Sequence, residues 1–377
     1  MNISFWEKET FFKDIDIAII GSGIVGLSAA IQLQQQHPRL KIIVLERGML
    51  PMGASSKNAG FACFGSPAEL LEDLKKHSEN ELFALIEKRW KGLLRLRKRL
   101  GDQRIDFQNN GGFDVFETEA DFLKCRDQLD YLNKHIASIT GKDQTYQVSD
   151  ESIARFGLQN VKHLIVNTTE SQIDTGKMIL SLIRLARESG TEIINGFEVK
   201  KMEDDGNLVW IHSRDEFSFS CKKVIVATNG FAQLLLPGYA VQPARAQVLI
   251  TEPIKNLKLK GTFHYNNGYY YFRNVENRVL LGGGRNLDFS KEETFEFGLT
   301  PLVQDKLDDL LKNMILPYTE YKVAMRWSGI MGMGPEKKSI VKATSKNIYC
   351  AVRMGGMGIA IGSLIGEEVA ALVAEQL

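Results

Sequence analysis

The sequence lacks the features by which several classes of protein are recognised. Its 377 residues carry 47 basic and 46 acidic side chains, whereas a broad nucleic-acid groove needs a clear excess of positive charge. The uncharged stretch Met354–Gly366 is too short and too rich in glycine to span a bilayer. The N-terminus shows no basic segment followed by an apolar one. We therefore expect no nucleic-acid partner, no secretory signal and no stable membrane insertion.

Cysteine and histidine are scarce and scattered. The four cysteines lie far apart without a CxxC pair, and none of the six histidines stands four residues from another. This spacing disfavours a disulfide framework or a metal site built from closely spaced ligands, so we expect no metal. Reduced, buried thiols are the favoured interpretation, and they indicate a cytoplasmic protein by default.

What is present is a glycine-rich turn between a strand and a helix at each end of the chain. Residues 15–20 predict a buried strand, 21–26 a glycine turn and 27–36 a helix. The segment 349–370 repeats this order of elements near the C-terminus. Between them, alternating apolar and polar residues over 241–285 predict antiparallel strands.

These elements predict an α/β (α+β) fold with two domains. A Rossmann-like nucleotide-binding domain would be assembled discontinuously from residues 1–80, 147–243 and 336–377. An inserted antiparallel-sheet substrate domain would comprise residues 81–146 and 244–335. The length exceeds one comfortable core, which agrees with two domains.

One segment of the second region is basic and amphipathic. Lys88–Leu100 reads "KRWKGLLRLRKRL", a pattern compatible with a membrane surface or an acidic partner. We favour a solvated helix face whose charge is balanced by acidic residues.

The first turn, "GSGIVG", fits the G-x-G-x-x-G pattern of a dinucleotide-binding site. Gly21 permits the tight turn, Gly23 lets the backbone approach a pyrophosphate, and Gly26 lets helix and strand pack closely. The helix N-terminus offers N–H donors to phosphate. Glu46 ends the next predicted strand, where its carboxylate can accept the ribose hydroxyls. We therefore predict a bound dinucleotide.

The rest of the pattern favours FAD over NAD. The residues 53–56, which are glycine, alanine and two serines, can fold back over the same pyrophosphate. A helix beginning near Gly355–Gly358 would direct its N–H groups at the pyrimidine side of a flavin. Two grips suit one long cofactor, so the discontinuous domain is predicted to bind FAD. The alternative is that the second turn serves only the packing of helix against strand.

Several stretches of the chain resemble the D-amino acid oxidase (DAO) superfamily of FAD-dependent amine and amino-acid oxidoreductases. They include "DIAIIGSGIVGLSAAIQL", "GASSKNAGF", "SQIDTGKMILSL", "YYYFRNVENRVLLGGGR" and "MGGMGIAIGSLIGEEVA". The resemblance extends to glycine oxidase, sarcosine oxidase and gamma-glutamylputrescine oxidase, and it covers nearly the whole chain. Sarcosine oxidase-like proteins attach FAD through a cysteine, where this chain has Gly329, so the resemblance implies non-covalent FAD.

The resemblance implies a set of cofactor-binding residues. They are Gly21, Ser22, Gly23, Ile24, Val25, Gly26, Glu46, Arg47, Ala54, Ser55, Ser56, Asn58, Ala59, Gly60, Phe61, Val199, Thr228, Asn229, Gly230, Gly332, Arg353, Gly355, Gly356, Met357, Gly358 and Ile359.

The substrate is expected over the flavin, beside the predicted strand 268–273. Alternation places Tyr269, Tyr271 and Arg273 on one face, and we assign these three to catalysis and substrate binding. Ordinary aromatic packing of a sheet face is the alternative. Glycine oxidase-like proteins hold the substrate carboxylate with two arginines, whose places are taken here by Met331 and Gly356. A glycine-like substrate is therefore disfavoured, while Arg273 can hold a more distant carboxylate.

The resemblance implies transfer of hydride from the carbon that bears the amine, giving an imine that water hydrolyses. A dry pocket lined by Tyr269, Tyr271 and Phe64 would favour the neutral amine. The alternatives are a 2-hydroxy-acid dehydrogenase of the same superfamily and a flavin-binding protein without catalysis. The sequence leaves open which amine is used, whether oxygen reoxidises the flavin, and the oligomeric state. Cys63 follows the predicted flavin loop, where we expect a buried filler rather than a reactive thiol.

Overall fold

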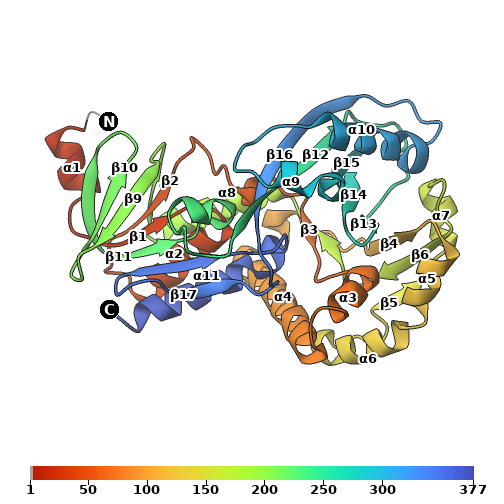
Figure 1. Ribbon diagram of the computed structural model, residues 1–377, viewed down its shortest axis with the longest axis horizontal. Coiled ribbons are helices and arrows are strands. Elements are labelled where there is room, and N and C mark those ends of the chain that lie inside the picture. Colours follow the sequence, from red (N-terminus) through yellow and green to blue (C-terminus); the bar gives the residue numbers. More distant parts are fainter. Residues whose placement is uncertain (1–2) are drawn as a thin grey trace.

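A computed structural model describes residues 3–377 and places them in two lobes, each built on an eight-stranded sheet (Figure 1). Both ends of the described chain lie in the first lobe, and the long helix α4 (Glu79–Leu100) runs along the join. A two-stranded sheet, β3 (Phe61–Ala62) with β7 (Ser171–Gln172), lies between the lobes. The predicted fold class is confirmed. Among the described residues, no helix combines the length and the apolar character needed to cross a membrane.

The first sheet has the strand order β17-β18-β11-β1-β2-β8, with β10 joined to β11 and β9 to β10. Its strands are β1 (Ile15–Ile20), β2 (Ile42–Glu46), β8 (Glu192–Asn195), β9 (Val199–Asp204), β10 (Val209–Ser213), β11 (Ser218–Val226), β17 (Ile340–Ala343) and β18 (Ile348–Val352). The central pairs β18-β11, β11-β1, β1-β2 and β2-β8 are parallel. Parallel strands buried on both faces are apolar throughout, which is why β1 and β2 could be predicted from their composition.

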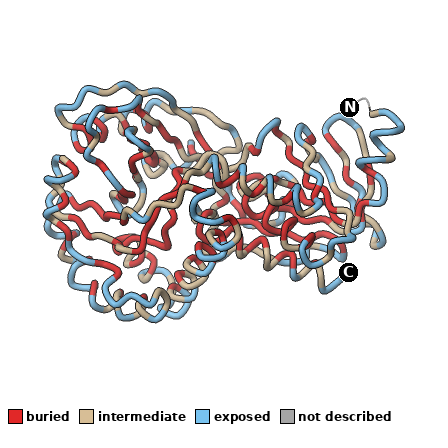
Figure 2. The backbone as a smooth tube through the Cα atoms, turned by 180° about the vertical axis from the view of Figure 1, so that it is seen from behind, coloured by how far each residue is buried: buried red, intermediate tan, exposed pale blue. Residues whose placement is uncertain are grey.

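Helices α2 (Ile24–Gln36), α8 (Thr175–Glu188) and α11 (Gly358–Ala374) pack with the C-terminal half of α4 over one face of this sheet. The buried residues of the first lobe run through its middle, between the sheet and these helices (Figure 2). Helices α2 and α11 lie so close that a Cβ at Gly366 would be 2.6 Å from the Ser28 Cβ. The other face is covered by a second core that includes Phe12, Phe197 and Phe219.

The second sheet has the order β16-β12-β15-β14-β13-β4-β6-β5. Its strands are β4 (Gly112–Phe116), β5 (Tyr146–Val148), β6 (His163–Asn167), β12 (Gln242–Thr251), β13 (Thr262–Tyr265), β14 (Tyr270–Val275), β15 (Arg278–Gly283) and β16 (Val323–Met333). All neighbouring pairs are antiparallel except β13 with β4. Phe263 and Phe272 stack on one face, 4.7 Å apart between ring centroids, in a core that helix α10 (Pro301–Leu310) covers.

One of the predicted boundaries changes. Strands β5 and β6 belong to the second sheet, because β6 pairs with β4 along its whole length; the prediction assigned residues 147–243 to the nucleotide-binding domain. Residues 67–100 form two helices, α3 (Pro67–Leu74) and α4, since Ser78 caps a new helix by accepting a hydrogen bond from the Glu81 N–H. The remaining helices are α1 (Phe5–Phe11), α5 (Glu119–Arg126), α6 (Leu129–Thr140), α7 (Glu151–Phe156) and α9 (Phe289–Glu292), and the short helical turns are η1 (Ala54–Ser56), η2 (Gln103–Ile105), η3 (Asn229–Leu234), η4 (Arg285–Leu287) and η5 (Leu311–Ile315).

Candidate functional site

The turn between β1 and α2 is shaped by two glycines. Gly21 has φ +107°, a backbone conformation that residues with a side chain rarely adopt. Gly26, in the first turn of α2, lies directly against this turn, because a Cβ there would be 2.0 Å from the Gly21 carbonyl oxygen. The predicted roles of both residues in the turn therefore have a steric basis. Gly23 precedes α2, and its Cβ would be 2.8 Å from the Ser55 Oγ.

Glu46 is buried at the end of β2, as predicted, and faces the glycine turn. The Ser22 Oγ–H donates to its carboxylate at 2.7 Å, and the Ser22 N–H donates at 3.2 Å. The Gly48 N–H donates to the other carboxylate oxygen at 3.1 Å. These bonds hold the ends of β1 and β2 together. Binding of ribose hydroxyls by Glu46 stays a prediction.

A cleft opens at the carboxyl ends of β1, β2 and β11. Ten of the predicted cofactor residues line it, namely Gly21, Ser22, Gly23, Glu46, Arg47, Ala54, Ser55, Val199, Thr228 and Asn229. The Thr228 hydroxyl oxygen is buried there without a hydrogen-bond partner in the described chain. Ligands of open parallel sheets bind outside the carboxyl ends of the strands. The cradle of glycines, the carboxylate and the unpaired hydroxyl thus fit the nucleotide half of FAD.

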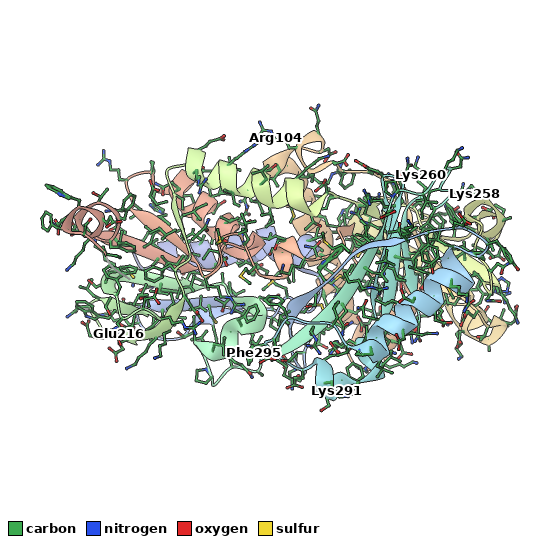
Figure 3. All side chains as sticks on the ribbon, turned by 90° about the horizontal axis from the view of Figure 1, so that it is seen from above. Arg104, Glu216, Lys258, Lys260, Lys291 and Phe295 are labelled. Atoms are coloured by element: carbon green, nitrogen blue, oxygen red, sulfur yellow. The ribbon has the colours of Figure 1, made fainter. Side chains whose placement is uncertain are left out.

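The cleft also contains apolar residues that the sequence reasoning missed. Phe197, Phe231, Leu235 and Ile330 line it, and the Arg47 guanidinium stacks 3.7 Å from the centroid of the Phe231 ring. Phe295, which Figure 3 shows near the middle of the molecule's length, packs its ring 6.2 Å from that of Phe231. These residues carry no motif. Only the proximity of Phe231 to the predicted Thr228–Gly230 turn was a usable signal.

The segment from Gly53 to Phe61 connects the cleft with the second lobe. At its start, the Ser55 Oγ accepts a hydrogen bond from the Ile24 N–H at 3.0 Å and so caps α2. In its middle, Asn58 donates to the Ala54 and Ser55 carbonyls and accepts from the Gly60 N–H. The Asn58 side chain is therefore occupied in shaping the segment. A molecule that follows this segment from the cleft arrives at the second sheet, against which Ala59 and Phe61 pack.

The C-terminal glycine turn is tied to the same cleft. Asn229, which lines the cleft, accepts hydrogen bonds from the Arg353 and Met354 N–H groups, each at 3.1 Å. The Gly355 N–H donates to the Gly332 carbonyl at 3.1 Å. Helix α11 starts at Gly358, within the predicted range, and lies beside the start of α2. The two glycine-rich turns, which lie near opposite ends of the sequence, are therefore neighbours in the fold.

Other predicted contacts around these turns have different roles. The Arg353 guanidinium is directed at the Lys338 and Ala240 carbonyls and at Glu336, which leaves only its backbone for a ligand. The side chains of Ile24, Val25 and Ile359 are buried in the helical core. The remaining predicted residues lie on the same three segments: Ser56 in η1, Gly230 in η3, and Gly356 and Met357 before α11.

The three predicted substrate residues, Tyr269, Tyr271 and Arg273, lie on or beside the second sheet, but they do not all share one environment. Tyr271 and Arg273 share the sheet face that Phe61 covers, with the rings of Phe61 and Tyr271 5.7 Å apart. Tyr269 precedes β14 and is 39% exposed at the rim. Phe64 does not line this face. It packs with Trp90 and Tyr146 in a separate core, and Phe61 and Trp327 form the aromatic wall instead.

Arg273 is the unusual residue of this face. Its side chain is 6% exposed, and its Nε has no hydrogen-bond partner among the described residues. Burial lowers the pKa of Arg273 to about 10, although Asp174 and Asp106 partly oppose the shift. The guanidinium lies against Gly60, where an added Cβ would be 2.9 Å from an Arg273 Nη. A buried cation without a partner carries a large desolvation cost, so the geometry suits an anionic ligand.

A parallel-sheet lobe with a cleft of this kind, joined to a lobe built on a largely antiparallel sheet, is typical of FAD-dependent oxidoreductases. The chain belongs to the DAO family of FAD-dependent oxidoreductases, which it matches over residues 16–372. It is 23% identical over 397 aligned positions to a probable oxidoreductase, OrdL, from Haemophilus influenzae, a match that covers 96% of this chain and 83% of that protein.

Solved structures share the fold. Glycine oxidase from Bacillus cereus superposes with a TM-score of 0.77 at 18% identity, covering 97% of this chain and 96% of that one. Iminodiacetate oxidase from Chelativorans gives a TM-score of 0.77 at 18% identity and covers 96% of both chains. The cofactor is FAD, as predicted from the two glycine turns.

Proposed function

We propose that this protein oxidises an amine or amino acid by transfer of hydride from the carbon that bears the nitrogen, and that the substrate carries an anionic group. The observation that carries the proposal is Arg273, a buried guanidinium whose Nε is unpaired, on the face that joins the second sheet to the Gly53–Phe61 segment. Charge-assisted hydrogen bonds from arginine to a carboxylate are among the strongest hydrogen bonds in proteins. An anionic substrate would therefore be held by its far end.

The residues of this face would prepare the amine for oxidation. FAD supplies the acceptor for the hydride when it is bound. An alkylammonium with a pKa near ~10 costs roughly 4–5 kcal/mol to deprotonate at pH 7. The rings of Phe61, Tyr271 and Trp327 exclude water from one side, which lowers the pKa of an amine by desolvation. Burial raises the pKa of the Tyr271 hydroxyl to about 12, so this group stays neutral and can only donate or accept hydrogen bonds.

The arrangement disfavours the simplest amino acids. Where glycine oxidase-like proteins are expected to hold the carboxylate beside the amine, this chain places the Met331 Sδ 3.7 Å from the Cβ position of Gly356. A thioether and a glycine cannot pair with a carboxylate. The anionic group is therefore expected beyond the amine, at Arg273.

The test is anaerobic titration of the flavin-loaded protein, followed by its visible absorbance. Amines with a terminal carboxylate are compared with their amides and with 2-hydroxy acids of the same length. We expect the carboxylated amines to bleach the flavin, with recovery in air reporting whether oxygen is an acceptor. Bleaching by the hydroxy acids alone would make the protein a 2-hydroxy-acid dehydrogenase. Bound flavin that no compound of either class reduces would favour a protein without catalysis.

A further inference from the structure

Three metal-ligating side chains from distant parts of the sequence meet beside the substrate face. They are Cys63, which follows β3, Glu170, which precedes β7, and His264, on β13. One ligand atom of each lies within 4.8 Å of the others. The exposed fractions are 4% for Cys63, 1% for Glu170 and 4% for His264.

The backbone explains the convergence. Strands β3 and β7 are antiparallel, with Ala62 opposite Ser171, so the next residues outward, Cys63 and Glu170, come to face each other. The Glu170 side chain then passes over β4 at Gly112, where a Cβ would be 2.2 Å from the Glu170 Cδ. It reaches His264, whose Nε2 lies 2.7 Å from the Glu170 Oε1.

One oxygen of this carboxylate has no protein partner. The Glu170 Oε1 accepts from Thr262 at 2.6 Å and faces His264, but the Glu170 Oε2 is buried with no hydrogen bond to any described residue. Buried polar atoms are almost always paired, and an unpaired carboxylate oxygen costs more than a neutral group would. A cation at this point would satisfy it.

The surroundings match those of a metal ligand set. The Glu69 Oε1 lies 3.7 Å from the Nδ1 of His264, on the ring nitrogen opposite Glu170; metal-bound histidines usually face a carboxylate in this way. Thr262 orients Glu170 through its hydroxyl. Binding of a divalent cation would release the proton of the Cys63 thiol, because a metal-bound cysteine is a thiolate.

We propose that Cys63, Glu170 and His264 bind one divalent cation of the zinc class, which links β3, β7 and β13 beneath Phe61. A sulfur, a nitrogen and an oxygen ligand suit Zn²⁺. Tetrahedral bonds of 2.0–2.3 Å place ligand atoms about 3–4 Å apart. The three side chains would therefore adjust from a spacing in which the ligand atoms lie within 4.8 Å of one another and the His264 Nε2 is 2.7 Å from the Glu170 Oε1. The Phe61 ring lies 5.3 Å from the imidazole, so the cation would hold the wall of the substrate face in place. This inference does not rest on the proposed function.

The sequence pattern predicted no metal, because the three ligands are about a hundred residues apart along the chain and follow no spacing rule. Only the pairing of β3 with β7 and the position of β13 bring them together. The argument from spacing therefore applies to local sites alone.

The experiment measures metal in flavin-loaded protein purified without a histidine tag. After treatment with a chelator and gel filtration, Zn²⁺ is added back and the bound metal is counted by mass spectrometry. Co²⁺ is added in parallel, because its d–d bands lie in the red, beyond the flavin absorption. We expect one equivalent per chain, visible d–d bands, and a rise in melting temperature with Zn²⁺, since the metal binds the folded state.

Three variants separate the site from general binding. Cys63→Ser should lower Zn²⁺ affinity by more than the roughly 10–100-fold expected for Glu69→Gln, which alters an outer partner. Cys125→Ser is the control, because Cys125 is also buried but packs in a separate core, and it should bind like the wild type. Absence of stoichiometric uptake and of d–d bands in the wild type would overturn the proposal. So would a Cys63→Ser protein that retains its flavin and binds Zn²⁺ as the wild type does.

Discussion

The nucleotide cleft of the first lobe and the candidate substrate face of the second sheet differ in the kinds of residue that form them. On the nucleotide side, the predicted cofactor positions include several where a side chain is missing or short, as at Gly21, Gly26 and Ser55, so we expect the backbone to do much of the binding. On the sheet side, the predicted positions are buried charged and aromatic side chains, such as Arg273 and Tyr271. The comparison teaches that the first site depends on space and the second on electrostatics. The two should therefore fail in different ways.

The largest expected effect follows from filling space on the nucleotide side. The Gly26→Ala variant places a Cβ 2.0 Å from the Gly21 carbonyl oxygen, an overlap with the backbone that no rotamer relieves. We expect a loss of several kcal/mol and protein that purifies without flavin. The measurement is the flavin-to-protein absorbance ratio together with the melting temperature.

Gly238→Ala is the control, because Gly238 has no positive φ and lies outside the residues that line the cleft, and its Cβ would meet no atom within 4 Å. This variant should bind flavin and melt within about 0.5 kcal/mol of the wild type. If both variants lost flavin equally, steric space at the glycine turn would not be what determines flavin binding.

Removing charge on the sheet side should change catalysis rather than folding. Arg273→Met keeps an unbranched, flexible side chain but removes the cation, so KM for a carboxylated amine should rise about 10–100-fold, at 1.4 kcal/mol per tenfold. Arg273→Lys, which keeps a point charge without the planar fork, should lie between. Steady-state kinetics with the acid and with its amide provide the measurement. An equal KM for wild type and Arg273→Met with the acid, together with altered flavin affinity, would assign Arg273 to the cofactor instead.

The same contrast explains what the sequence could predict. The strand–turn–helix units were readable because their signals are local: β1 and β2 are uniformly apolar, and the glycines stand at fixed offsets. Alternation also separated the two faces of β14 correctly, with Tyr270 and Phe272 in the core. These features depend on residues that are close in the chain.

What could not be predicted depends on contacts between distant segments. Phe64 was expected to line the pocket, yet the chain turns at Gly65 and places Phe64 against Trp90. Strands β5 and β6 carry no mark of the sheet they join, so the boundary at residue 147 was wrong. The cluster of Glu170 with His264 is invisible until β7 and β13 are placed. Local sequence patterns predict helices and strands, whereas contacts between distant segments determine which elements pack together.

A further prediction concerns pH and the buried acids of the sheet side. Burial raises the pKa of Asp114 to about 7, above that of the unfolded chain. The folded state therefore binds this proton more tightly, and its stability falls as pH rises from about 5 toward 7, at up to 1.36 kcal/mol per unit. An asparagine at position 114 cannot ionise. As pH rises from 5 to 8, the free energy of unfolding of Asp114→Asn should therefore increase by about 2 kcal/mol relative to that of the wild type. Thermal melts of chelator-treated protein at both pH values measure this.

The control for Asp114 is Asp121→Asn. Asp121 is exposed on α5, where a hydrogen bond from Lys124 lowers its pKa, so its ionisation affects stability only at more acidic pH. Its melting curve should follow that of the wild type between pH 5 and pH 8. A wild-type stability that rises over this range would contradict the assignment of Asp114.

The smallest effect is expected where the two sides are joined. Helix α4 contributes Leu82 and Ile86 to one core and Leu93 to the other, so apolar packing holds the lobes together. Its basic face, which alone suggested a membrane or an acidic partner, is paired within the chain: Lys88 lies 2.8 Å from Glu368 of α11, with both side chains partly exposed. Lys88→Ala should therefore cost no more than about 0.5 kcal/mol.

Salt provides the check on this last assignment. The small difference between Lys88→Ala and the wild type should vanish at high ionic strength, because partly exposed pairs are screened. Lys91→Ala, whose lysine pairs with Glu87 on the same helix, should behave alike. If instead either variant lost binding to vesicles of anionic lipid that the wild type bound, the basic face would be a surface for partners. The pairing with α11 argues against this, since Arg95 and Arg99 are also bound to Glu367 and leave little free charge on that edge.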